Sequence, residues 1–266
     1  MSSVFRIVNP TNQEVPILLS IPHSGTQFPE EIRDQFDPTL AKAPDDTDWF
    51  VDMLYDFAPE MGITTLAANY SRWVIDLNRD PQSKPLYNDG RLITALCPTT
   101  TFTGIPLYRD QRKEVNPSNV LHRTKEYFDP YHRQIDIMLQ DLKARHGRVL
   151  LWDCHSIRRV VSTIHRDPFP DLILGDVDGT SASPGLIEAV MTTLDHSTYR
   201  IGHNYPFKGG FITRHFGQPV NHQHALQLEM SKVNYMDDAE VKYHPDRAVK
   251  MRSLLKQNFE RILETL

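Results

Sequence analysis

Short runs of apolar residues, bounded by Gly, Pro or polar residues, predict buried strands along the chain. Because strands covered on both faces read as continuous apolar runs, these runs indicate a sheet with helices on both sides. They lie at about Val15–Ile21, Ile63–Ala68, Trp73–Leu77 and Val149–Trp152, in "PDLILGD" and in "HALQLEM".

Apolar residues three and four positions apart predict helices between and after these strands. Such spacing occurs over Trp49–Phe57 and Val120–His146, from Pro184 onward, and over Pro245–Leu266. Pro130 must kink or split the second helix, because proline lacks the backbone N–H that a helix interior needs. From about residue 82 to 119 the periodicity is weak, which predicts a long surface loop of the kind that borders active sites.

The order of these elements predicts an α/β fold: a mixed, largely parallel sheet flanked by helices. The 266 residues and the 39% hydrophobic content are enough to fill a sizeable core. No internal repeat or linker divides the sequence, so we expect one domain over residues 1–266.

Composition narrows the classes of partner. A formal net charge of -5 gives no general attraction for nucleic acid or acidic membranes, and no apolar run is long enough to cross a bilayer. Two cysteines, and an N-terminus without a signal-peptide pattern, predict a reducing, cytoplasmic location. We therefore expect a small-molecule partner, and the sequence leaves open whether the chains form a homo-oligomer.

Polar side chains follow two of the predicted strands, where a sheet of this type gathers its functional groups. His23 follows the first strand and His155 follows "LLWDC", so the two imidazoles are expected to converge. A catalytic zinc ion takes nitrogen and carboxylate ligands and keeps one position open for water. Asp46 and Asp48 are candidates for the carboxylate; helix capping is the alternative, and the spacing does not decide between them.

Glu229 lies between Leu228 and Met230 in an apolar run. A lone carboxylate costs several kcal/mol to bury, so Glu229 must either form a salt bridge or face a site. Next to a metal ion, such a group can act as a general base.

Cys154 precedes His155 directly, which raises the alternative of a cysteine nucleophile. Adjacent residues of a strand point to opposite faces, so this pair is not expected to form the required hydrogen bond. We expect Cys154 to pack in the core and Asp153 to support a histidine ligand.

Arginines flank the same strand ends. Arg72, Arg79 and Arg214, together with Asn78 and Lys208, would make a cationic group on an acidic protein. Guanidinium groups bind carboxylates bidentately, so this set predicts a specific small anion, although each arginine taken alone fits a structural ion pair equally well.

Several blocks of the sequence together resemble the N-formylglutamate amidohydrolases, or N-formylglutamate deformylases, of histidine breakdown. The blocks are spread in order from about Ile17 to Met236. They are "IPHSG", "DTDW", "SRWVIDLNRD", "LLWDCHSI", "KGGFITRHFGQP" and "HALQLEM" followed by "YM".

The resemblance implies a zinc carboxypeptidase-like (phosphorylase/hydrolase-like) fold, shared with aspartoacylase and succinylglutamate desuccinylase. It implies one divalent metal ion, zinc by preference, held by His23, His155 and a carboxylate. In those relatives a glutamate ligand follows the first histidine by three residues, but this chain has Thr26 there. The carboxylate must come from elsewhere, with Asp48 as first choice and Asp46 as reserve.

The resemblance also implies roles for other residues. Glu229 falls at the position of the general base, and Arg72 is expected to stabilise the oxyanion or a substrate carboxylate. Substrate binding is expected of Asn78, Arg79, Arg214, Ser156 and Lys208. The implied reaction is metal-dependent hydrolysis of N-formyl-L-glutamate to formate and L-glutamate, the last step of histidine degradation. The alternatives are a deacylase of another N-acyl amino acid, N-acetyl or N-succinyl, and a non-catalytic anion-binding protein.

Overall fold

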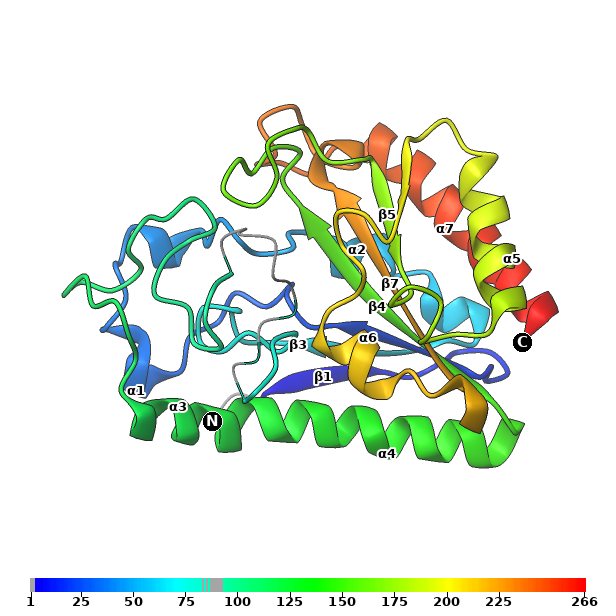
Figure 1. The fold of residues 1–266 in the computed structure, drawn as a ribbon, viewed down its shortest axis with the longest axis horizontal. Helices are drawn as coiled ribbons and strands as arrows, with labels where there is room; N and C mark the ends of the chain where they lie inside the picture. Colours follow the sequence, from blue (N-terminus) through cyan, green and yellow to red (C-terminus); the bar gives the residue numbers. More distant parts are fainter. Residues whose placement is uncertain (1–2, 83, 85, 87–92) are drawn as a thin grey trace.

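A computed structural model describes residues 3–82, 84, 86 and 93–266 of the chain. Seven strands of this part form one sheet in the order β1-β3-β2-β4-β7-β5-β6, with helices on both faces (Figure 1). The prediction of an α/β fold with a mixed, mostly parallel sheet is confirmed. Among the described helices, none is long and apolar enough to span a membrane.

The central strands β2, β3, β4 and β7 run parallel to one another, while β1 and the β5–β6 pair run the other way. The strand bounds are β1 Phe5–Val8, β2 Ile17–Ile21, β3 Thr64–Ala68, β4 Val149–Ile157, β5 Leu172–Gly175, β6 Ile201–His203 and β7 Gln223–Ser231. Strands β2, β4 and β7 are neighbours, so their carboxyl ends meet at one edge of the sheet.

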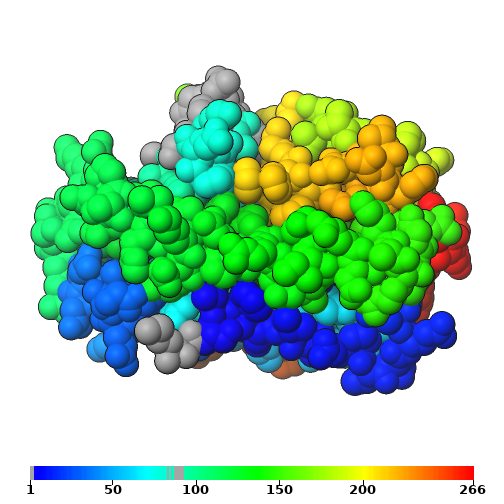
Figure 2. Space-filling view, turned by 90° about the horizontal axis from the view of Figure 1, so that it is seen from below, coloured from blue at the N-terminus to red at the C-terminus, as the bar shows by residue number. Residues whose placement is uncertain are grey.

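Helices α4 and α6 cover one face of the sheet, and α2, α5 and α7 cover the other (Figure 1). The helix bounds are α1 Glu30–Arg33, α2 Val51–Leu54, α3 Pro117–Arg123, α4 Asp129–His146, α5 Pro184–Asp195, α6 Phe211–Phe216 and α7 Pro245–Thr265. Seen from below, the green band that contains α3 and α4 crosses the middle of the molecule (Figure 2).

Alternate side chains of β4 enter two separate cores. Leu150 and Trp152 pack with residues of α5 and α7, whereas Leu151 packs with residues of α4 such as Leu139. All of these side chains are fully buried, and each contributes about 1.5–3 kcal/mol of transfer free energy. Burial on both faces explains why the strand reads as a continuous apolar run.

Two predicted elements differ from the structure. The strand expected at Trp73–Leu77 is wrong: this segment forms turns, in which Val74 N–H donates to Ser71 and Asp76 N–H donates to Leu96. Its apolar residues are buried in the core on the α4 face of the sheet, together with Leu66 and Leu96, without joining the sheet. The helix expected over Trp49–Phe57 is reduced to α2, and a separate 3-10 turn follows at Ala58–Met61.

The long helix predicted around Pro130 is divided, as expected. Helix α3 ends at Arg123, a π-helical turn spans Thr124–Phe128, and α4 begins at Asp129, with Pro130 in its first turn. Proline is tolerated there because the first turn has no intrahelical acceptor for its N–H. Where the structure describes the predicted loop of residues 82–119, it has no regular strand and no helix before α3.

Candidate metal centre and active site

His23 and His155 meet at the carboxyl ends of two neighbouring parallel strands. His23 follows β2, His155 lies near the end of β4, and their ring centroids are 5.0 Å apart. Gly25 lets the loop after β2 pass close to Tyr70, because a Cβ there would lie 2.5 Å from the Tyr70 carbonyl oxygen. The convergence of the two histidines follows from the parallel pairing of their strands.

Asp48 completes the group from the loop before α2. One carboxylate oxygen, Oδ2, lies 3.3 Å from His155 Nδ1 and 3.7 Å from His23 Nδ1. The loop is fastened to both histidine segments: Asp48 N–H donates to the His23 carbonyl, and Ser156 N–H donates to Asp48 Oδ2. His23, Asp48 and His155 each offer a ligand atom, and these atoms all lie within 4.8 Å of one another.

The three residues fit a divalent metal ion. All are buried, at 1–3% exposure, and neither His23 Nδ1 nor Asp48 Oδ1 has a hydrogen-bond partner among the described residues. Buried polar atoms without partners are costly, and a bound cation would satisfy both. Two imidazole nitrogens and one carboxylate oxygen are a donor set that suits zinc and leaves a position for water.

The second nitrogen of each imidazole contacts a buried carboxylate. His23 Nε2 lies 2.9 Å from Asp76 Oδ1, and His155 Nε2 lies 2.8 Å from Asp153 Oδ2. Such pairs hold the Nε2–H tautomer and leave Nδ1 free to bind a metal. The sequence predicts this support for Asp153 but not for Asp76, whose only signal is a lone acid within the apolar run "VIDL".

Neighbouring charges offset the effect of burial on the ionisable groups of this cluster. Burial would raise the pKa of Asp76, but the nearby charges of Arg72, His23 and Arg79 hold the pKa well below its usual value. Burial would lower the pKa of His155, but Asp153 raises this pKa well above the ordinary value. The Asp153 carboxylate therefore favours a positive charge at His155, which a proton or a metal ion can supply.

Asp46 lies outside the group of three. Its carboxylate accepts hydrogen bonds from Trp73 Nε1 at 2.9 Å and from Phe102 N–H at 3.2 Å, and burial raises its pKa. Helix α2 has no side-chain cap, so helix capping does not explain either aspartate. The geometry thus favours Asp48 as the carboxylate that accompanies the histidines.

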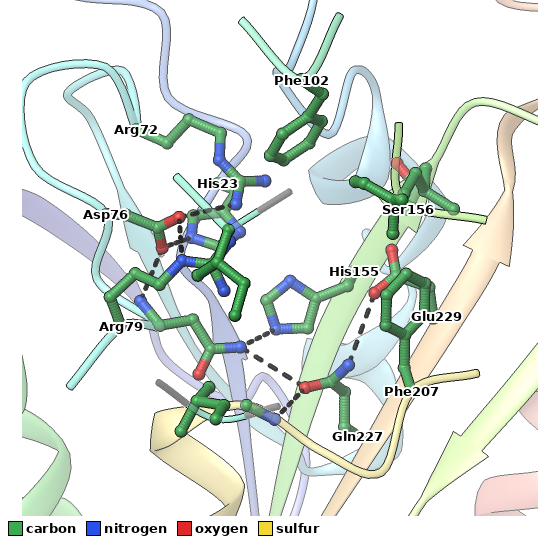
Figure 3. Close-up of a pocket in the computed structure, with 16 residues that line it drawn as sticks. His23, Arg72, Asp76, Arg79, Phe102, His155, Ser156, Phe207, Gln227 and Glu229 are labelled. Atoms are coloured by element: carbon green, nitrogen blue, oxygen red, sulfur yellow. Dashed lines mark hydrogen bonds and ion pairs between the residues drawn. The ribbon is translucent and has the colours of Figure 1, made fainter. Parts of the chain in front are cut away.

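A cavity of about 80 Å³ opens beside the two histidines. Glu229 of β7 lies on its wall, level with His155 in the strand register (Figure 3). Burial raises the pKa of Glu229 to about 8, and its carboxylate forms no ion pair with a described residue. Glu229 therefore faces the cavity, and the alternative of a structural salt bridge is not supported.

Two arginines line the opposite side of the cavity (Figure 3). Arg72 donates to Asp76 at 2.8 Å, lies 3.6 Å from Asp48 Oδ1, and has its guanidinium over the Phe102 ring. Arg79 donates to Thr94 and lies 3.6 Å from Asp76. Asp76 therefore orients both guanidinium groups as well as His23.

Asn78 also lines the cavity, but its amide contacts protein groups. Its Oδ1 accepts from Ile212 N–H at 2.8 Å, and its Nδ2 lies 3.0 Å from His155 Nε2 and 3.2 Å from Asp153. Asn78 thus contacts both His155 and Asp153, the carboxylate that orients His155. A direct contact between Asn78 and substrate stays a prediction.

Of the three remaining predicted substrate-binding residues, one lines the cavity and two do not. Ser156 lines the cavity, whereas Arg214 and Lys208 are not among its lining residues. Arg214 Nε donates to the Gly209 carbonyl, and Lys208 Nζ lies 2.8 Å from Asp178. An apolar part of the cavity wall, which the sequence did not predict, is made by Phe102, Ile157, Ile164 and Phe207.

Cys154 is fully buried in the core that contains α5 and α7, away from the cavity. Burial raises its thiol pKa well above the usual value, which disfavours the thiolate that a cysteine nucleophile needs. This agrees with the predicted packing role.

Comparison with known proteins gives consistent matches. A model of the N-formylglutamate amidohydrolase family matches residues 15–236. The N-formylglutamate deformylase of Pseudomonas aeruginosa is 42% identical, covering 94% of this chain and 93% of that protein. That of Pseudomonas putida is 38% identical, covering 94% and 92%.

Solved structures show the same architecture. The N-formylglutamate amidohydrolase from Ralstonia eutropha JMP134 matches with a TM-score of 0.78 and 27% identity, over 98% of this chain and 97% of that one. A gene product of Agrobacterium tumefaciens matches with a TM-score of 0.75 over 98% and 95%, and at 15% identity it supports the fold alone. On the family match and the two deformylase relatives together, the chain belongs to the N-formylglutamate amidohydrolase family.

Proposed function

We propose that this protein hydrolyses N-formyl-L-glutamate to formate and L-glutamate, with one divalent metal ion, zinc by preference, held by His23, Asp48 and His155. The observation that carries the proposal is the buried group of two imidazoles and one carboxylate beside a cavity with Glu229 on its wall. Two relatives at about 40% identity, named N-formylglutamate deformylase, support the substrate.

The metal ligands would be Nδ1 of each histidine and the carboxylate of Asp48. A divalent ion there would polarise the formyl oxygen and lower the pKa of a water molecule. Asp76 and Asp153 hold the two imidazoles by their Nε2 atoms, so the ligand atoms are positioned before the ion binds.

Glu229 moves the proton. Its carboxylate takes a proton from the attacking water and gives it to the departing amine nitrogen. A pKa near neutrality suits a group that must both accept and release a proton, and burial raises that of Glu229 to about 8. A nearby cation opposes this rise, because positive charge favours the carboxylate.

The arginines bind negative charge. Arg72, held by Asp76 next to the histidines, stabilises the charge that develops on the carbonyl oxygen during attack. Arg79, the second arginine on the cavity wall, binds a substrate carboxylate through its guanidinium fork. Phe102 and Phe207 cover the methylene groups of the glutamate part.

We further propose that the reaction takes place in the cytoplasm as the last step of histidine breakdown. Both cysteines, Cys97 and Cys154, are buried free thiols, in agreement with a reducing compartment. The activity named for the relatives supports the place in the pathway.

The experiment is to measure release of the acyl product from N-formyl-, N-acetyl- and N-succinyl-L-glutamate by the zinc-loaded protein. We expect N-formylglutamate to have the highest kcat/KM. Preference for a bulkier acyl group would support the alternative deacylase, and binding of all three compounds without turnover would support a non-catalytic anion-binding protein.

A further inference from the structure

Arg123, the last residue of α3, is a buried cation that does not line the active-site cavity. Its side chain is 0% exposed, and its Nη1 donates to the Val74 carbonyl at 3.0 Å and to the Tyr108 hydroxyl at 2.9 Å. Neither acceptor is a carboxylate, and Nε and Nη2 have no hydrogen-bond partner in the part of the chain that the structure describes. Because arginine stays charged at neutral pH, its burial without a carboxylate is unfavourable unless these contacts offset the loss of hydration.

The Val74 carbonyl belongs to a segment that forms one side of the active site. This segment, residues 71–79, forms turns and is not part of the sheet. It carries three labelled residues of the cavity wall, Arg72, Asp76 and Arg79 (Figure 3). Because no neighbouring strand fixes the segment, its position depends on individual contacts such as the hydrogen bond from Arg123.

Val74 is two residues from Arg72 and two residues from Asp76, so a displacement of its peptide group would move both. Asp76 contacts His23 Nε2 at 2.9 Å and Arg72 at 2.8 Å. A shift at Val74 would therefore reach a proposed metal ligand and the arginine proposed to stabilise the oxyanion. Displacements of about 1 Å far from the reacting atoms can lower the rate of an enzyme about a hundredfold.

Two aromatic rings hold the Arg123 guanidinium in place. It lies 5.9 Å from the ring centroids of Phe36 and Tyr108, which stack on each other at 4.6 Å. A guanidinium within about 6 Å of a ring centroid is attracted to the ring electrons. Phe36 and Tyr108 are buried in the same core as Val74, so the donor and its acceptor share one packed environment.

We propose that Arg123 is a positioning residue for the hydrolysis: through the Val74 carbonyl it fixes the segment that carries Arg72 and Asp76. This inference rests on the proposed function. A purely structural role predicts something different, namely that replacement of Arg123 lowers stability and leaves the kinetics of the folded protein unchanged. Stability and activity can be separated here, because replacing a buried charge by an apolar residue of similar volume is often neutral or stabilising.

Arg123→Met tests the proposal, because it removes the donor and keeps most of the side-chain volume. In the zinc-loaded protein we expect kcat/KM for N-formylglutamate to fall at least about tenfold, while the thermal unfolding midpoint changes little. In a zinc titration without substrate, the dissociation constant should rise severalfold, because His23 is less firmly oriented. Arg123→Lys, which keeps a donor but not the planar group, should have an intermediate kcat/KM.

Tyr108→Phe is the matched control, because it removes the other acceptor of Arg123 and keeps the hydrogen bond to Val74. Its kcat/KM should stay close to that of the unmodified protein. The proposal is wrong if Arg123→Met keeps full kcat/KM and zinc affinity, or if Tyr108→Phe loses as much activity as Arg123→Met.

If Arg123→Met does not fold, Arg123→Lys decides: lower stability with unchanged kcat/KM and zinc affinity would overturn the positioning role. Absence of formate release by the unmodified protein would instead overturn the proposed function. The zinc titration needs no turnover, so it would still test the role of Arg123, and the two failures are distinguishable.

Discussion

At the scale of single residues, Asp76 connects two parts of the site. Its carboxylate contacts His23 Nε2 at 2.9 Å and Arg72 at 2.8 Å, and it lies 3.6 Å from Arg79. One buried side chain therefore orients a proposed metal ligand and both arginines of the cavity. Because the pKa of Asp76 is held well below its usual value, it stays ionised at neutral pH.

Glu229→Gln is expected to lower kcat by at least about a hundredfold, because the amide can no longer accept a proton from water. Zinc content should not change, since Glu229 is outside the group of proposed ligands. Steady-state kinetics and metal analysis of the same preparation check both statements.

Glu240→Gln is the matched control for Glu229. Both side chains are 9% exposed, but the Glu240 carboxylate accepts hydrogen bonds from Arg158 and Arg159. We expect its kcat to stay within a few-fold of the unmodified protein. Equal activity in the two variants would argue against a general base at position 229.

We expect the buried imidazole of His132 to make the folded protein less stable in acid. Burial lowers its pKa to about 4, its ring stacks on Phe128 at 3.8 Å, and its Nδ1 lies 3.0 Å from the Phe128 carbonyl. Since the unfolded chain gains this proton near pH 6.5, its contribution is present above that pH and is lost as pH falls toward 4. The contribution of this one group is about 3 kcal/mol.

His132→Phe should therefore show a smaller drop in the free energy of unfolding between pH 6.5 and 4. Urea denaturation at several pH values measures the difference. Parallel pH profiles for the variant and the unmodified protein would show that His132 does not titrate in this way.

At the scale of elements, the predictable strands were those with continuous apolar sequence. Strands β2 and β4 lie where the sequence predicts them, although β4 continues through Asp153 and His155 to Ile157. The extension was not predictable, because its polar residues depend on partners that are distant in the sequence. His155, for example, contacts Asp48 and Asn78. At Trp73–Leu77 the apolar residues are buried in the core beside the sheet, and burial alone does not make a strand.

The residue that precedes α6, Gly210, packs tightly against Asn78 in the site. Gly210 N–H donates to Gln227 at 2.8 Å, and a Cβ at Gly210 would lie 2.2 Å from Asn78 Nδ2. Gly210→Ala should therefore displace Asn78 from Asp153 and His155 and lower kcat/KM at least about tenfold, the scale at which misplacement affects catalysis.

Gly185→Ala is the control for Gly210→Ala. Gly185 lies in α5, and no heavy atom is within 4 Å of its added Cβ. We expect full activity and a gain of about 0.5–1 kcal/mol in the free energy of unfolding. If both alanine variants keep full activity, the position of Asn78 does not matter for the reaction.

At the scale of the whole molecule, the site joins segments that are far apart in the sequence. His23, Asp48 and His155 come from the end of β2, a loop and β4, and Glu229 comes from β7. The sequence predicts the convergence of the two histidines, since parallel strands end at the same edge. It leaves Asp46 and Asp48 as alternatives, because the path of a loop depends on contacts such as Trp73 Nε1 with Asp46.

A metal ion bound to these segments should stabilise the folded chain as a whole. Zinc at a free concentration a thousandfold above Kd adds about 4 kcal/mol to the free energy of unfolding. Thermal unfolding with zinc and with a chelator measures the shift, which Asp48→Asn should largely remove. The same shift in Asp48→Asn would place the bound ion elsewhere.

Titration of the metal-free protein with zinc, while formate release from N-formyl-L-glutamate is followed, tests the central claim most directly. We predict that the rate rises in proportion to added zinc and levels off at one equivalent per chain, and that His155→Ala shows no such rise. A full rate in the metal-free protein, or an unchanged titration in His155→Ala, would contradict the account.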